Sequence, residues 1–201
     1  MVTINSRGSG PGRPRHPGHD EKIIDATLRL IDGNRKVTVN AVVEESGVSR
    51  AAVYRRWPSM TDLIATALDQ GRSTPLIDTS GDIRSALIDA LYTRSTVLRA
   101  VGETYTSRRF RKRLELMMSD QDLQRAYWRS HVEPRRASPI EALKIARERG
   151  EIRADVDVEA ALDAMYGTFY YQIVVRGESL SEDRALDRCI EAFDLIWAGM
   201  Q

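Results

Sequence analysis

The stretch that decides the fold is AVVEESGVSRAAVYRRW, residues 41–57. It contains two short, partly apolar segments separated by Gly47, and the second segment holds three arginines and a tyrosine. Glycine readily adopts the positive φ that ends many helices, and Ser49 and Thr38 are residue types that cap helix N-termini. The pattern therefore predicts a helix, a tight turn and a second helix, which Pro58 ends.

Valine pairs flank both predicted caps at the spacing of a hydrophobic staple. Val37 and Val42 occupy the N′ and N4 positions of the first helix, and Val48 and Val53 occupy those of the second. Such pairs fix the angle at which the chain enters a helix. The two helices are therefore expected to be anchored to a common core.

The rest of the chain also repeats apolar residues at intervals of three and four, which is typical of amphipathic helices. The predicted helices cover residues 20–32, 60–77, 82–101, 107–118, 120–149, 157–176 and 182–199. No segment alternates with period two for long enough to predict a sheet, so the expected fold class is all-α. Within 120–149, Pro134 and the capping pattern Ser138-Pro139-Ile140-Glu141 predict a kink or a restart of the helix.

Composition excludes several classes of protein. The chain has 201 residues, 42% of them hydrophobic and 29% charged, with a net charge of +1. No apolar run approaches the roughly 20 residues of a membrane span, and nothing at the N-terminus marks the chain for export. The single Cys189 excludes an internal disulfide. These features predict a cytoplasmic protein without a membrane partner.

The beginning of the chain differs in composition from the rest. Residues 1–18 are rich in glycine, proline and arginine, and contain no acidic residue. Such a segment cannot bury a core, so we expect a disordered basic tail. Two interpretations are open, a solubilising end or an arm that contacts nucleic acid.

A helix, a turn with glycine and a second helix form the helix-turn-helix plan, in which the second helix enters the major groove N-terminus first. The residues expected at base edges are Ser49, Arg50, Ala51 and Ala52. The residues expected nearer the DNA backbone are Tyr54, Arg55 and Arg56. Thr38 and Ser49 are also candidates for phosphate contacts, because a helix N-terminus attracts anions. The alternative is a solvated helix whose arginines keep it soluble.

These residues resemble a known family. The stretch VTVNAVVEESGVSRAAVYRRWPSMTDLI, residues 37–64, is similar to the N-terminal DNA-binding domain of the tetracycline-repressor (TetR) family. IIDATLRLID, 23–32, matches the first helix of that domain, and GRPR, 12–15, resembles its basic lead-in. The chain departs from the family pattern at Asn34, Ala51, Ala52 and Met60. Asn34 still tolerates a left-handed turn, whereas Met60 removes one expected phosphate contact.

The resemblance implies two domains: a three-helix DNA-binding domain at 19–66 and a C-terminal helical domain for ligand binding and dimerisation at 67–201. Residues 147–183 resemble the regulatory domain of many members, whose last two helices pair with those of a second copy. The residues expected at this dimer interface form two apolar stripes: Leu162, Met165, Phe169 and Ile173, and Leu186, Ile190, Phe193 and Trp197. The other interpretation of these stripes is an ordinary core.

The family also implies a small-molecule cavity, and aromatic or otherwise amphipathic side chains are typical of such pockets. The candidate ligand-binding residues are Tyr92, Met117, Tyr127, Trp128, His131, Tyr166 and Tyr170. A small hydrophobic or aromatic effector would suit them. His131 lacks a second ligand at helical spacing, so we expect no metal site and no cofactor.

The expected function is a ligand-responsive transcriptional regulator, a repressor by family default, that binds a palindromic DNA operator as a homodimer. The alternatives are a constitutive DNA-binding regulator without an effector and a protein-interaction adaptor. An enzyme is not expected, because the chain lacks a phosphate-binding Gly-rich loop after a strand, a His-Glu-x-x-His motif and a Gly-x-Ser-x-Gly motif. The sequence identifies neither the operator nor the effector nor the regulated genes.

Overall fold

The computed structural model describes residues 18–72, 74, 76–92, 107–178 and 183–201, which form helices and connecting turns without a β-strand. The helices are α1 (His19–Asp32), α2 (Val39–Ser46), α3 (Arg50–Tyr54), α4 (Met60–Asp69), α5 (Ile83–Tyr92), α7 (Ser107–Ser119), α8 (Gln121–Tyr127), α9 (Glu133–Glu148), α10 (Val158–Tyr170) and α11 (Asp183–Met200). Two π-helical turns, η1 (Trp128–Val132) and η2 (Tyr171–Val175), continue α8 and α10. The all-α prediction is confirmed. Among the residues described, none of the helices combines the length and the apolar character that a transmembrane span requires.

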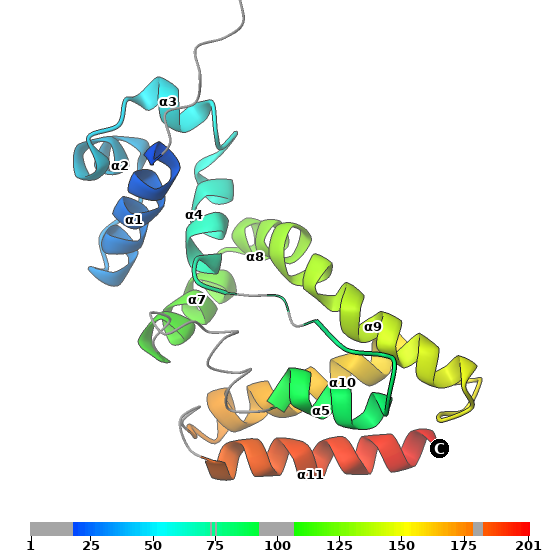
Figure 1. Cartoon of the computed structure of the whole chain (residues 1–201). Coiled ribbons are helices and arrows are strands. Elements are labelled where there is room, and N and C mark those ends of the chain that lie inside the picture. The colour runs from blue at the N-terminus through cyan, green and yellow to red at the C-terminus, as the bar shows by residue number, and fades with distance from the viewer. Residues whose placement is uncertain (1–17, 73, 75, 93–106, 179–182) are drawn as a thin grey trace, which may run out of the picture.

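Helices α1 to α4 enclose the first core (Figure 1). Its buried residues are Ile23, Leu30, Val42, Val48, Ala52, Val53, Trp57 and Leu63. Three of the four staple valines belong to this core and Val37 packs against it, as the spacing predicts. The Trp57 indole also donates a hydrogen bond of 3.1 Å to Thr66 Oγ1, which ties the end of the α3 segment to α4.

The predicted caps of this domain are present. Thr38 Oγ1 accepts a hydrogen bond from the Ala41 amide, and Ser49 and Ser59 cap α3 and α4 in the same way. Gly47 ends α2 at φ 69°, in the left-handed region that glycine adopts without strain. Asn34 has φ 53°, so asparagine supports the left-handed turn after α1 as expected.

A second core lies between α5, α9, α10 and α11, at the bottom of Figure 1. Leu143, Leu162 and Phe193 are fully buried there. Cys189 is also buried, and burial raises the pKa of its thiol to about 11. The thiol is therefore protonated at neutral pH and serves as a small core residue.

A third apolar cluster joins the two parts. Leu68 of α4 and Ile31 of α1 pack with Leu123 and Tyr127 of α8. α4 thus contributes Leu63 to the first core and Leu68 to this junction. The two domains consequently meet through buried side chains of α4.

Several predicted boundaries are wrong. α4 ends at Asp69 rather than at residue 77, because Gln70 is extended and Gly71 adopts φ 81°. The predicted restart at Ser138 is absent, and Pro139 lies inside α9. The irregularity lies earlier, in η1, and Pro134 occupies the first turn of α9, where its missing N–H is tolerated. The tail 1–17 and the second half of the predicted helix 82–101 lie outside the described residues.

The first core yields a stability prediction. Leu63→Ala removes a fully buried side chain and should lower the free energy of unfolding by about 2–5 kcal/mol. Leu76 is 91% exposed, so the matched Leu76→Ala change should stay within about 0.5 kcal/mol. Chemical denaturation followed by circular dichroism measures both values. Equal losses in the two variants would contradict this assignment of the core.

Candidate nucleic-acid interface

The exposed surface of α3 gathers residues suited to nucleic acid. Ser49, Arg50, Ala51, Tyr54 and Arg55 are all exposed, and Tyr54 keeps 47% of its surface accessible. The Ala51 side chain is small enough for α3 to approach the base edges in a DNA groove closely. An arginine such as Arg50 can form two hydrogen bonds with a guanine. This face of α3 therefore combines close approach, positive charge and hydrogen-bond donors.

Ala52 does not belong to this face. It is 8% exposed and packs in the first core with Val53 and Trp57. The prediction that Ala52 meets a base edge is therefore wrong. The rotation of α3 about its axis is set by the residues that it buries, and Ala52 lies on the buried side.

Arg56 is also held inside the domain. Its side chain is 8% exposed, its Nε is paired with the Asp20 carboxylate, and its Nη1 donates to the Ala52 carbonyl oxygen at 3.1 Å. It thereby ties the end of α3 to the start of α1. The structure corrects its predicted role as a backbone contact, because the guanidinium is committed to protein groups.

Asn40 is a residue that the sequence analysis missed. It is exposed on α2, and its Oδ1 accepts a hydrogen bond from Arg50 Nη2. Asparagine can read adenine with two hydrogen bonds, and the contact also orients Arg50. Its position in the first turn after the Thr38 cap is the signal that could have identified it.

The N-terminal end of α2 adds to the positive edge. Thr38 is partly buried and uses its oxygen as the helix cap, and Lys36 just before it is exposed. Arg29 and Arg35 both pair with Glu45 at the other end of α2. The hydrogen bond from Arg29 is the largest factor that lowers the pKa of Glu45. These pairs hold α2 against α1 and the turn that follows it.

The predicted ligand-binding residues are distributed over separate places. Tyr92 is buried in the second core, where its hydroxyl donates to the Met165 carbonyl oxygen at 2.8 Å. Tyr166 packs against the same core. Tyr170 is 39% exposed and stacks on Phe110. Tyr92 and Tyr166 therefore share the second core, whereas Tyr170 stacks outside it on Phe110.

The other four candidates lie near the junction of the domains. Met117 and Tyr127 belong to the third cluster, and His131 follows in η1. Trp128 is 44% exposed and lines a shallow surface pocket with Gln124, Arg125 and Arg129. The structure brings Met117, Tyr127 and His131 together and leaves Trp128 outside that group.

The group around Tyr127 is a charged network centred on Asp69, the last residue of α4. Asp69 Oδ1 accepts a hydrogen bond of 2.8 Å from the Tyr127 hydroxyl and is paired with Arg135 of α9, and Oδ2 lies 3.1 Å from His131 Nδ1. The Tyr127 oxygen accepts hydrogen bonds from Arg72 and Arg113. The network thus connects α4 to α7, α8, η1 and α9.

Opposing effects act on the Asp69 carboxyl. Burial by itself would raise its pKa, but hydrogen bonds from His131 and Arg135 and the charge of Arg135 lower the pKa well below its ordinary value. Asp69 is therefore ionised at neutral pH. A partly buried carboxylate that has several cationic partners holds the end of α4 at a defined place.

The predicted dimer stripes face inward. Six of their residues are less than 9% exposed: Leu162, Met165, Ile173, Leu186, Phe193 and Trp197. Phe169 and Ile190 are partly buried against the same cores. The prediction of a subunit interface is wrong for these six residues, because the protomer itself covers them, and it stays a prediction for Phe169 and Ile190.

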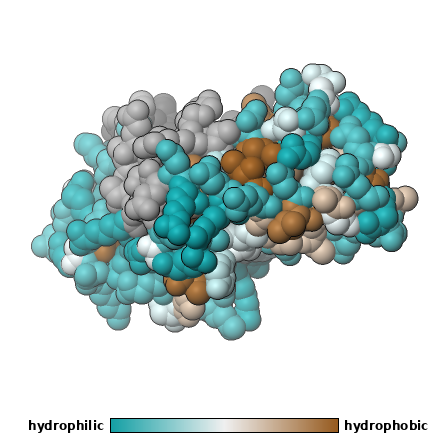
Figure 2. Space-filling model, turned by 90° about the horizontal axis from the view of Figure 1, so that it is seen from below, coloured by the Kyte–Doolittle hydropathy of each residue, from teal (hydrophilic) through white to brown (hydrophobic). Residues whose placement is uncertain are grey.

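A different face of the same helices is exposed. On α10 and η2 it comprises Ala160, Ala164, Gly167, Tyr171 and Val174, and on α11 it comprises Leu195, Ala198 and Gly199. The spacing of three and four places each set on one side of its helix. Figure 2 looks onto the side of the molecule where α11 lies, and apolar atoms gather near the middle of that surface. The apolar part of the last helices is thus wider than the protomer buries.

The N-terminal and the C-terminal part of the chain each match a known protein family. Residues 23–67 match the family described as bacterial regulatory proteins, tetR family. Residues 77–192 match the family described as tetracyclin repressor-like, C-terminal domain. The first match contains α2, α3 and most of α1 and α4, and the second runs from the connection after α4 into α11.

Individual relatives match over most of their length. The HTH-type transcriptional regulator YdeS of Bacillus subtilis (strain 168) is 27% identical over 93% of this chain and 94% of its own. The HTH-type transcriptional regulator Rv1556 of Mycobacterium tuberculosis (strain ATCC 25618 / H37Rv) is 26% identical over 85% and 86%. The solved structure of the TetR family transcription regulator SCO0332 superposes with a TM-score of 0.61 at 27% identity, over 89% of this chain and 96% of that one.

Adjacent arginines provide a test of this interface. Arg56→Ala should lower the free energy of unfolding by about 1–3 kcal/mol, because it removes a side chain that is 8% exposed and takes the Nη1 donor from the Ala52 carbonyl oxygen. Arg55→Ala should leave stability unchanged, because Arg55 is exposed. It should instead weaken binding to duplex DNA by the same factor for every sequence. The slope of the logarithm of the binding constant against the logarithm of salt concentration should become less steep by about one.

Denaturation curves and fluorescence anisotropy at several salt concentrations measure the two effects. If Arg56→Ala had the same free energy of unfolding as the wild type, the role of Arg56 in tying the end of α3 to the start of α1 would be contradicted. If Arg55→Ala left both affinity and salt slope unchanged, Arg55 would lie outside the interface.

Proposed function

Because this chain belongs to the tetR family of bacterial regulatory proteins, we propose that it represses transcription as a homodimer on a palindromic operator and is released by a small molecule. Proteins of this family are DNA-binding regulators without enzymatic activity. The chain is accordingly a transcriptional regulator, and the prediction that it is not an enzyme is confirmed by the family match. We also propose that it acts in the cytoplasm, where bacterial DNA lies.

The observation that carries the proposal is the exposed N-terminal face of α3. Arg50 and Ala51 lie in its first turn and Tyr54 at its end. We propose that Arg50 reads a base edge, oriented by Asn40, and that Tyr54 and Arg55 contact phosphates. Thr38 and Ser49 would place the amides of two helix N-termini against the DNA backbone.

A dimer follows from the size of the recognition helix. α3 has five residues, and a single helix of this kind reads only a few base pairs. Two copies about 34–36 Å apart would read both halves of a palindrome. We propose that the exposed face of α10, η2 and α11, rather than the buried stripes, forms the subunit interface. Its alanines and glycines permit close approach of helices, and Leu195 is 77% exposed.

We propose that the effector acts through the position of α4. The Asp69 network fixes the end of α4 against α7, α8, η1 and α9, while the start of α4 packs in the DNA-binding domain. A ligand that prefers a different arrangement of the C-terminal helices would shift α4 and change the spacing of the two α3 helices. The ligand contributes only its differential affinity for the two states. The hydrophobic or aromatic nature of the effector is proposed from the amphipathic side chains of the C-terminal helices.

Selection of bound fragments from genomic DNA, followed by footprinting, tests the proposed function. We expect two protected half-sites whose centres are one helical turn of DNA apart, and loss of protection in Arg50→Ala. Protection of a single half-site, or none at low ionic strength with α3 intact, would contradict the proposal. An operator whose affinity no metabolite changes would favour the constitutive regulator.

The dimer interface is tested by a matched pair of leucine variants. Leu195→Glu places a charge in the proposed interface, so it should shift the protein to monomer and weaken operator binding at least about tenfold, or 1.4 kcal/mol. Leu76→Glu changes a leucine outside this face that is even more exposed than Leu195, and this variant should remain dimeric. Analytical ultracentrifugation measures the oligomeric state. A dimeric Leu195→Glu protein with full affinity would exclude this interface.

The Asp69 network gives a second prediction. Asp69→Asn keeps the shape of the side chain but removes the charge that pairs with Arg135 and His131, so unfolding should become easier by about 3 kcal/mol. Operator affinity should change at least about fivefold if α4 is repositioned. Asp155→Asn, at a carboxylate that is 80% exposed, should alter neither.

The pH dependence has a defined sign. The folded-state pKa of Asp69 lies below its unfolded value, so its stabilisation is complete above about pH 5 and is lost only as the solution becomes strongly acidic. Denaturation of wild type and Asp69→Asn across pH measures this difference. A difference that was already lost near neutral pH would contradict the assigned pairing.

A further inference from the structure

The segment before α1 supplies positive charge that the proposed function does not use. Residues 1–17 contain Arg7, Arg13 and Arg15 and no acidic residue, and they lie outside the described part of the chain. Their point of attachment is described, because Gly18 directly precedes α1. The position of α1 therefore decides what this segment can reach.

The start of α1 lies beside α3. The Asp20 carboxylate is paired with Nε of Arg56, just after α3, whereas the end of α1 contacts α7 through Asp32 and Arg109. Figure 1 shows that α1 starts near α3 and runs away from it. Segment 1–17 is consequently attached on the side of the domain that carries α3.

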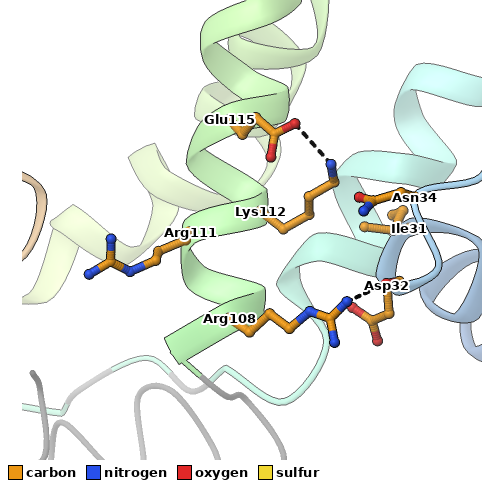
Figure 3. Close-up of a pocket in the computed structure, with 7 residues that line it drawn as sticks. All are labelled: Ile31, Asp32, Asn34, Arg108, Arg111, Lys112 and Glu115. Atoms are coloured by element: carbon orange, nitrogen blue, oxygen red, sulfur yellow. Dashed lines mark hydrogen bonds and ion pairs between the residues drawn. The ribbon is translucent and has the colours of Figure 1, made fainter.

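Helix α7, the other segment rich in cations, is remote from α3. Arg108 donates to the Asp32 carbonyl oxygen at 3.0 Å, and Lys112 Nζ is 2.9 Å from Glu115 Oε1 (Figure 3). Asp32 ends α1, about 18 Å from Asp20 along the helix axis at roughly 1.5 Å per residue. DNA bound at α3 therefore gains nothing from these two cations, which already have protein partners.

Helix α3 itself offers few cations to DNA. Arg50 and Arg55 are exposed, but the Arg56 side chain is 8% exposed and is committed to Asp20. Affinity for DNA rises with the number of phosphates that cations neutralise. The three arginines of segment 1–17 therefore outnumber the two that remain exposed at α3.

The acidic residues at the start of α1 do not cancel these arginines. Asp20 and Glu21 stand in the first turn, where the helix dipole favours negative charge. Asp20 is paired with Arg56, and the exposed Lys22 follows Glu21. The first turn and its partner are thus close to neutral together, so the net positive charge of segment 1–17 remains.

The order of residues in this segment suits a narrow groove. PGRPRHP, residues 11–17, places a proline at every third position, and proline disfavours helix and predicts extended backbone. The minor groove of DNA is about 6 Å wide, which is too narrow for a helix of about 10–12 Å in diameter. An extended chain fits there, and the strong negative potential of A·T-rich minor grooves attracts arginine.

Two of the arginines are within reach of that groove. Arg15 and Arg13 stand three and five residues before Gly18, which corresponds to about 10 and about 17 Å of extended chain. The minor groove next to the α3 site lies about half a turn of DNA away, or roughly 17 Å. The length of the segment therefore matches the distance that it has to span.

We propose that residues 12–15 lie in the DNA minor groove beside each half-site and favour A·T over G·C pairs there. The proposal rests on the proposed function, because α3 has to occupy the neighbouring major groove. A·T pairs present only acceptors in the minor groove, which suit arginine donors, whereas G·C pairs add the guanine N2 amino group. Homeodomain proteins combine a major-groove helix with an N-terminal minor-groove arm in this way.

Inosine·cytosine pairs separate minor-groove from major-groove recognition, because they lack the N2 amino group and keep the major-groove edge of G·C. Fluorescence anisotropy on the full chain compares selected operators with A·T, I·C or G·C pairs about half a turn from the centre of each half-site. We expect equal binding of the A·T and I·C duplexes and at least about fivefold weaker binding of the G·C duplex.

The R13A/R15A variant should bind the three duplexes alike. The slope of the logarithm of its binding constant against the logarithm of salt concentration should be less steep by about two for each bound protomer. The matched control R111A/R129A removes two exposed arginines of the C-terminal domain, and Arg111 points away from α1 in Figure 3. It should keep the wild-type preference and slope. Circular dichroism should show the same helix content in all three proteins.

Two outcomes overturn the proposal while the operator remains protected and the proposed function stands. Equal binding of the I·C and G·C duplexes by the wild type would mean that the arginines contact phosphates alone. An R13A/R15A protein with the wild-type preference and slope would mean that the segment only keeps the protein soluble. If no operator is selected, the proposed function fails, and alternating dI·dC and dG·dC duplexes serve as probes instead. Equal affinity of the wild type for these two duplexes would then overturn the minor-groove contact.

Discussion

The structure depends on the burial of α4 in two apolar clusters at once. Leu63 belongs to the core beneath the helix-turn-helix, whereas Leu68 packs between α1 and α8. One helix of ten residues therefore cannot move in one domain without disturbing packing in the other. Because protein interiors are close-packed, such a helix changes between discrete positions rather than bending continuously. This makes α4 a stiff connection between the C-terminal domain and the helix-turn-helix.

Electrostatics reinforce that connection at a single carboxylate. Asp69 lies where α4 ends and receives contacts from Tyr127, His131 and Arg135, which come from three successive elements of the C-terminal domain. Buried ion pairs contribute modest net stability because desolvation opposes them, but they penalise every arrangement that leaves a charge without its partner. The network consequently favours one position of α4 more strongly than apolar contacts alone would. The π-helical turn that contains His131 is the irregularity that accompanies this contact.

The same physical argument explains two corrections on the surface. Arg56 and Ala52 stand in a stretch whose composition suits DNA, yet the first is paired with Asp20 and the second is buried. The apolar stripes of α10 and α11 suit a subunit interface, yet the protomer covers them. In each case, residues whose type would suit contact with DNA or with a second subunit instead contact other residues of the same protomer. Residues on the opposite side of each helix, such as Arg50 on α3 and Leu195 on α11, remain exposed.

The sequence by itself determined the all-α class, the helix-turn-helix, its caps and the turn at Asn34. These features depend on contacts within three or four residues, such as Ser49 with the Ala52 amide, or on apolar periodicity within one helix. Only the tertiary structure decided how each helix is rotated, where α4 ends and which cations meet at α7. Asp69 and Arg135 are 66 residues apart in the chain, and Arg109 and Asp32 are 77 apart. No local pattern encodes such pairs, because the folded arrangement of several helices brings them together.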